Sequence, residues 1–209
     1  QEGLYTVVWH PFGGQPDPAV LCAVSDALEK MPGAELRLSP DETAYLVNLN
    51  GAETRTMLDL THESARTLFE SSVSSIGGTV CHVGTRDSQG LLAACVTAVQ
   101  KAGLPDGALP QIHISGCPSS CGTHQTGSLG FRGASKLVDG KPRSAFTLFV
   151  GGDDRQGCEA MGRELGVMLE ERIPGFLTEV GRAAAAQGFA AWREAEPAAL
   201  EEIAARYLA

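Results

Sequence analysis

Residues 111–122 read QIHISGCPSSCG, and this stretch decides how the rest of the chain is interpreted. Its first five residues, Gln111–Ser115, alternate apolar and polar side chains as a strand does. Cys117 and Cys121 follow, separated by three residues, and Gly122 permits close backbone approach after the second cysteine. Two soft thiolates on one loop suit iron–sulfur or zinc coordination. The spacing alone leaves a metal site and a pair of structural thiols equally open.

The composition limits the classes of protein to be considered. The chain has 209 residues, 43% of them hydrophobic, and its 16 basic and 25 acidic side chains give a net charge of −9. This size predicts one or two domains with a substantial core. The acidic surface argues against nucleic acid and membrane partners, and no apolar run reaches the ~20 residues of a membrane helix. Six cysteines are too few for a disulfide scaffold.

The beginning of the chain carries no targeting pattern. Gln1-Glu2-Gly3 lacks an initiator methionine, and a strand-like run starts at Leu4. We interpret the chain as a piece of a longer polypeptide and expect that polypeptide to be cytoplasmic.

The first part of the chain has the pattern of a small α+β unit. Apolar spacing and turn residues predict the order strand, helix, strand, strand, helix, with helices covering one face of an antiparallel sheet. We expect this unit to span residues 1–62. The predicted strands are 4–9, 34–38 and 44–49, and the helices are 20–31 and 52–60.

A second unit is predicted from residue 63 to residue 150. Residues 63–70 have a helical pattern, and the serine- and glycine-rich run 71–78 predicts a flexible loop that leads to Cys81. A helix with Leu91, Cys95 and Val99 on one face is predicted next, capped by Asp87 or Ser88. Strands are expected at 111–115, 128–131 and 144–150, and residues 151–209 are expected to form helices packed on this unit. The three predicted C-terminal helices are 161–169, 176–186 and 197–207.

The longer string GCPSSCGTHQTGSLGFRG, residues 116–133, is far more specific than the two cysteines. It resembles the sirohaem-dependent nitrite and sulfite reductases in the region that holds their [4Fe–4S] cluster. That family has a second cysteine pair upstream, separated by five residues. The matching run here is SIGGTVCHVGTRDS, residues 75–88, and it aligns Gly77, Cys81, Gly84 and Ser88 with the family pattern.

In this alignment a serine occupies the first cysteine position. The resemblance implies that Cys81, Cys117 and Cys121 bind the cluster, that Ser75 takes the fourth position, and that Cys121 links the cluster to the sirohaem iron. A hydroxyl is less acidic than a thiol and offers a harder ligand atom. A serine-ligated cluster, a three-iron cluster, a labile cluster and no cluster therefore all remain open. Another register makes Cys81 the first ligand and Asp87 the second, but it loses the glycine matches.

The resemblance also suggests residues that contact sirohaem. Arg132, Lys136, Lys141 and Arg143 form a local basic stretch, and sirohaem, sulfite and nitrite are all anionic. A solvated hairpin is the alternative interpretation. His124 follows Cys121 by three residues and is a candidate cofactor contact or substitute ligand, with a loop-stabilising hydrogen bond as the alternative.

As the resemblance implies, the fold is α/β (α+β). Residues 1–62 would be a ferredoxin-like half-domain, 63–150 an iron–sulfur and sirohaem domain, and 151–209 a helical segment. The family enzymes contain two such repeats, and this chain would be the one that holds the cluster. The parent oxidoreductase would reduce sulfite or nitrite by six electrons from ferredoxin or a flavoprotein, and the other repeat or a second subunit would complete it. We expect no turnover from this chain alone. The alternatives are a scaffold half without cofactor and a zinc site.

Overall fold

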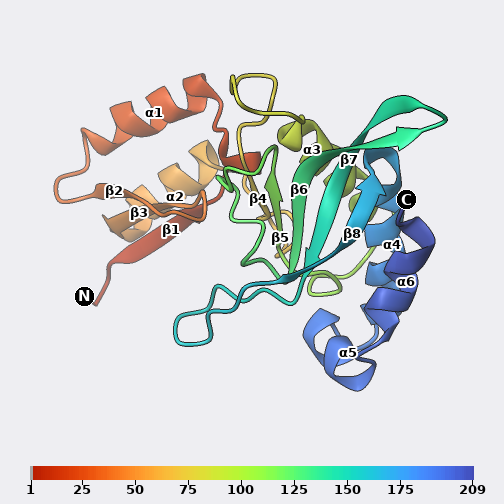
Figure 1. Cartoon of the computed structure of the whole chain (residues 1–209). Coiled ribbons are helices and arrows are strands. Elements are labelled where there is room, and N and C mark those ends of the chain that lie inside the picture. The colour runs from red at the N-terminus through yellow and green to blue at the C-terminus, as the bar shows by residue number, and fades with distance from the viewer. Residues whose placement is uncertain (1) are drawn as a thin grey trace. The chain divides into compact units, whose positions relative to one another are not determined.

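The computed structural model describes residues 2–209 and divides the chain into two compact units (Figure 1). One unit ends at Arg66 and the other spans Thr67–Ala209. Helices and sheets of mixed strand direction make this a mixed α/β protein, as the sequence predicted. Within residues 2–209, no helix is long and apolar enough to cross a membrane.

The first unit contains a three-stranded antiparallel sheet in the order β1-β3-β2. The predicted order of strands and helices is confirmed. A core of buried apolar side chains that includes Trp9, Leu46 and Met57 lies between the sheet and the two α-helices. The elements are β1 (Tyr5–Trp9), the short 3₁₀ helix η1 (Phe12–Gly14), α1 (Pro18–Leu28), β2 (Glu35–Leu38), β3 (Ala44–Leu49) and α2 (Gly51–Leu60).

The second unit contains a five-stranded sheet in the order β4-β5-β6-β7-β8. Strands β4, β5 and β6 run parallel, whereas β6, β7 and β8 are antiparallel neighbours. Its elements are β4 (Val73–Ser74), α3 (Ser88–Lys101), β5 (Ile112–Ser115), β6 (Leu129–Val138), β7 (Lys141–Val150), β8 (Arg163–Leu169), η2 (Glu170–Arg172), α4 (Ile173–Ala184), α5 (Phe189–Ala195) and α6 (Ala199–Tyr207).

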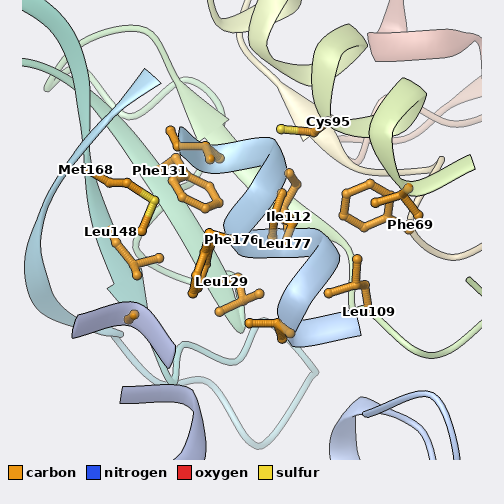
Figure 2. Close-up of a cluster of buried hydrophobic side chains, with 14 of the residues drawn as sticks. Phe69, Cys95, Leu109, Ile112, Leu129, Phe131, Leu148, Met168, Phe176 and Leu177 are labelled. Carbon is orange, nitrogen blue, oxygen red and sulfur yellow. The ribbon is translucent and has the colours of Figure 1, made fainter. Parts of the chain in front are cut away.

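The core of the second unit lies between this sheet and the helices α3 and α4. Figure 2 shows Phe176 and Leu177 of α4 among side chains from the strands, including Ile112 and Leu129. Cys95 of α3 is fully buried in the same cluster, as its predicted apolar stripe requires. Burial raises the pKa of this thiol, so Cys95 is a neutral core residue rather than a reactive one. Ile112 and Ile114 anchor β5 in this core.

The helix predicted at residues 161–169 is wrong, because Arg163–Leu169 forms strand β8. Met161, Leu165 and Met168 have helical spacing, but Met161 is 73% exposed and does not belong to an apolar face. Met168 instead pairs with Phe146 of β7 and is fully buried. Pairing with a distant strand therefore overrides the local pattern, as is common for short apolar segments.

The helix predicted at residues 63–70 is also absent from the structure. Its backbone N–H groups have other partners: Ala65 donates to the carbonyl oxygen of His10, and Leu68 donates to Oδ1 of Asp106. The flexible loop predicted at 71–78 is wrong as well, since Val73–Ser74 forms β4 and both residues are buried.

Two further differences concern the ends of elements. The strands predicted at 128–131 and 144–150 extend into one long hairpin, Leu129–Val138 with Lys141–Val150. Helix α4 begins at Ile173, before the predicted start, and the short helix α5 was not predicted. Pro174 occupies the first turn of α4, where its missing N–H costs no hydrogen bond.

Candidate iron–sulfur site

The candidate ligands come together at the ends of two neighbouring parallel strands. β4 ends directly before Ser75, and β5 ends two residues before Cys117. Ser75, Cys81, Cys117 and Cys121 all line one small pocket. Because β4 and β5 run parallel and are hydrogen-bonded to each other, the segments that follow them start side by side.

The two cysteine-bearing segments are joined at Gly116. Its carbonyl oxygen accepts from the backbone N–H groups of Thr85 and Arg86, at 3.1 and 3.0 Å, and from the Thr85 hydroxyl at 2.7 Å. Its own N–H donates to Oγ of Ser75 at 3.0 Å. Gly116 therefore fixes the residues flanking Cys81 relative to those flanking Cys117.

Two glycines are required by close packing at this site. A Cβ atom on Gly77, whose φ is +74°, would lie 2.8 Å from the backbone nitrogen and the hydroxyl of Ser88. A Cβ atom on Gly122 would lie 2.0 Å from the carbonyl oxygen of Ile114. Glycine is the residue type that permits such approaches. The glycine aligned at 77 thus has a physical reason in this chain.

The three cysteines of the pocket differ in exposure. Cys117 is buried at 7% exposure, Cys81 is half-buried and Cys121 is exposed. Asp87, the second ligand in the alternative register, is the N-cap of α3 and accepts from the N–H of Gly90 at 2.9 Å. It does not line the pocket, so the geometry favours the register that starts at Ser75.

A mononuclear site has no support in the described part of the chain. Among residues 2–209, no three His, Cys, Asp or Glu side chains are arranged to hold one metal ion. The zinc alternative needs His124 beside the cysteines, but His124 does not line their pocket. Whether an iron–sulfur cluster fits depends instead on the ligand atoms that the pocket residues offer. Three cysteines and a serine line one pocket, and three thiol donors are a set that fits a cluster with three cysteine ligands.

His124 is buried in the protein rather than presented to a cofactor. It is 3% exposed, and its ring packs against Phe149 with a centroid distance of 4.8 Å. Burial, together with the positive charge of Arg132 and the nearby His113, lowers the pKa of His124 from 6.5 to about 4. The imidazole is therefore neutral at physiological pH, and its buried Nδ1 has no hydrogen-bond partner among the described residues.

The basic side chains predicted to bind sirohaem have partners within the second unit. Arg132 lies 3.3 Å from Glu164 and stacks over Phe149 at 5.1 Å. Arg143 pairs with Glu171 at 2.8 Å, and Lys136 donates to the backbone oxygen of Ala209 at 2.6 Å. None of these residues lines the cysteine pocket. Arg132 and Arg143 pair with carboxylates and Lys136 with a backbone oxygen, so a role of these side chains in binding sirohaem stays a prediction.

Two residues that matter to the site were not predicted from the sequence. One is His113, whose Nδ1 lies 2.8 Å from Oγ1 of Thr123, two residues after Cys121. The other is Ser88, which was expected only as an aligned residue and a candidate helix cap, and which hydrogen-bonds Ser75. Both contacts join residues that are far apart in the sequence, so no local pattern reports them.

Comparisons with known proteins find similar sequences among the ferredoxin–nitrite reductases. A ferredoxin–nitrite reductase from Synechococcus elongatus is 27% identical over 190 residues, covering 86% of this chain and 36% of that protein. The chloroplastic ferredoxin–nitrite reductase of Zea mays is 28% identical over 163 residues, covering 73% of this chain and 28% of the relative. No family model matches the chain.

A solved structure shares the fold over almost the whole chain. The structure of the Mycobacterium tuberculosis NirA protein superposes with a TM-score of 0.77 at 20% identity, covering 97% of this chain and 40% of that one. The chain is therefore similar in sequence to ferredoxin–nitrite reductases, as the cysteine motif indicated, and it shares the fold of the NirA protein. It spans about a third of the length of these curated relatives.

Proposed function

We propose that this chain is the iron–sulfur part of a reductase that acts on nitrite or sulfite. The observation that carries the proposal is the convergence of Cys81, Cys117 and Cys121 on one pocket, in a chain whose relatives are ferredoxin–nitrite reductases. An iron–sulfur cluster would supply single-electron transfer, which a six-electron reduction needs repeatedly.

The residues of the chain would have separate roles at this site. The three cysteine thiolates would bind iron, and the hydrogen bonds at Gly116 would hold the cysteines of the two segments in register. Cys121 is the exposed member of the set, so it is the candidate for the link to sirohaem that the family resemblance implies. No other residue is assigned to sirohaem, because Arg132, Lys136 and His124 are engaged elsewhere.

The rest of the enzyme would have to supply what this chain lacks. We place the anionic substrate, the remaining sirohaem contacts and the docking site for ferredoxin or a flavoprotein in the other repeat or a second subunit. Ferredoxin and nitrite are the donor and substrate that the relatives' names favour. The isolated chain should therefore bind a cluster without turning over nitrite or sulfite.

The test is anaerobic reconstitution of the 209-residue chain with ferrous iron and sulfide, followed by analysis of iron and acid-labile sulfide. Cys117→Ala should lose the bound iron. The matched controls are Cys22→Ala and Cys158→Ala, because both cysteines are exposed and neither lines the pocket. A folded chain that binds no iron would support the scaffold alternative. Bound zinc without sulfide would support the zinc alternative.

A further inference from the structure

The hydroxyl of Ser75 is used by the protein itself. Its Oγ accepts from the N–H of Gly116 at 3.0 Å and lies 3.0 Å from Oγ of Ser88. The Ser88 hydroxyl donates to the backbone oxygen of Ser75 at 2.7 Å. A serine hydroxyl has one proton, so the proton between the two hydroxyls must come from Ser75. Ser75 is therefore a neutral, protonated donor in this network.

This assignment conflicts with a role as an iron ligand. An alkoxide ligand needs the Ser75 proton to leave, and the bond that this proton makes to Ser88 would then be lost. Ser88 could restore a bond to the alkoxide only by turning its own proton away from the backbone oxygen of Ser75. Ligation at Ser75 thus breaks a hydrogen bond in either case.

The same network gives Ser75 a structural role. It joins the end of β4 to the first residue of α3 through Ser88, and to the end of β5 through Gly116. Gln89 reinforces the connection, since its Nε2 donates to the backbone oxygens of Ser74 and Ser75 at 3.0 and 3.2 Å. A cysteine sulfur is a weak hydrogen-bond acceptor and would not replace this connection.

We infer that the pocket holds its cluster through Cys81, Cys117 and Cys121 alone, and that one corner has no protein ligand. The inference rests on the function proposed above. The stable form would be a three-iron cluster. After one-electron reduction by a donor such as dithionite, the [3Fe–4S]⁰ cluster would take up one Fe²⁺ to give [4Fe–4S]²⁺, so charge and atoms balance. The fourth iron would be exchangeable, because no side chain retains it.

The test compares four forms of the reconstituted chain by iron content and EPR. Wild type and Ser75→Ala should both contain three irons and show the same three-iron EPR signal. Ser75→Cys should contain four irons, and its oxidised form should lack the three-iron EPR signal. Ser88→Ala is the matched control, since it removes the Ser75 partner and leaves the candidate ligand in place. It should keep three irons and lower the melting temperature of the cluster-free chain, as Ser75→Ala does.

The outcomes separate this inference from the proposed function. If wild type retains four irons and Ser75→Ala retains three, Ser75 is a ligand and the inference is wrong, while the proposed function stands. If none of the four forms binds iron, the proposed function fails. If the variants do not fold, iron uptake by the wild-type protein provides a second test. Reduced protein incubated with ⁵⁷Fe²⁺ should take up one ⁵⁷Fe per cluster, as measured by Mössbauer spectroscopy, and no uptake would contradict the inference.

Discussion

Nδ1 of His113 lies 2.8 Å from Oγ1 of Thr123, and this contact ties strand β5 to the loop that follows Cys121. On the other side of the ring, Nε2 of His113 lies 3.8 Å from Oδ2 of Asp154. The tautomer of His113 decides whether Nδ1 or the Thr123 hydroxyl donates in this hydrogen bond. Burial lowers the pKa of His113, which keeps the ring neutral in this arrangement.

The contact between His113 and Thr123 predicts a change in the reactivity of Cys121. Thr123→Val removes the hydroxyl while keeping the side-chain shape, and it should lower the free energy of unfolding by about 1 kcal/mol. The loop should then move more freely, and iodoacetamide should label Cys121 of the cluster-free chain several-fold faster. Peptide mass spectrometry measures the rate. Thr123→Ser keeps the hydroxyl and should label like wild type, and equal rates for the two variants would contradict this role.

The low pKa of His124 predicts a loss of stability in mild acid. The unfolded imidazole titrates near 6.5 and the folded one near 4, so between these values the unfolded chain binds more protons. The stabilisation is complete above pH 6.5 and is lost as the pH falls toward 4, with a total of about 3 kcal/mol. Urea denaturation at several pH values measures it.

A comparison of variants isolates this effect. His124→Leu should lose less stability than wild type between pH 6.5 and pH 4.5, because the titrating group is gone. His62→Gln is the control, since His62 is exposed, and it should follow wild type. If the free energy of unfolding of His124→Leu depends on pH as steeply as that of wild type, the loss of stability in acid comes from other groups. His10 and His113, whose pKa values are also lowered, are the candidates.

The charge of Arg132 should be visible in the titration of His124. Arg132 contributes to the lowered pKa of the imidazole, after burial. Arg132→Met keeps much of the side-chain volume over Phe149 and removes the charge, so the pKa of His124 should rise from about 4 toward its ordinary value. NMR of the histidine ring protons measures the shift. Arg143→Met removes an equal charge elsewhere on the hairpin and should leave His124 unchanged.

Gly122 should not tolerate a side chain. Gly122→Ala would bring a Cβ atom to 2.0 Å from the carbonyl oxygen of Ile114, and backbone on both sides must then shift. We expect a loss of at least about 2 kcal/mol in the free energy of unfolding, and weaker iron binding after reconstitution. Gly51→Ala meets no atom within 4 Å and lies at the start of α2, so it should be neutral or stabilising. Similar stabilities for the two variants would show that the close approach is not required.

The sequence predicted the parts of the fold that local patterns determine. The apolar stripe of Leu91, Cys95 and Val99 marked α3, and the Asp87 cap was one of two expected. The helix predicted at residues 161–169 was wrong, because a strand whose position is set by pairing with β7 can have helical spacing by coincidence. The buried strand β4 was missed for a related reason, since Ser74 is polar and its burial follows from the pairing of β4 with β5.

The site was predictable only in its residue types. Spacing and family resemblance identified Ser75, Cys81, Cys117 and Cys121, and the pocket brings these four together. The hydrogen bonds of Ser75 with Ser88 and Gly116 join positions that are 13 and 41 residues apart. The charge of Arg132 was interpreted as available to a ligand, but Glu164 of another strand lies 3.3 Å away and forms an ion pair with it. Such partners are set by tertiary structure.

The bonds that Gly116 makes to Thr85, Arg86 and Ser75 have a consequence for the order of assembly. They involve only backbone and hydroxyl groups, so the walls of the pocket reach their final shape without iron. Loading should then follow folding as a separate event, and the iron-free chain should be a ready acceptor for a cluster delivered intact by a carrier. Small zinc-dependent modules behave in the opposite way, because their metal is needed for the chain to fold at all.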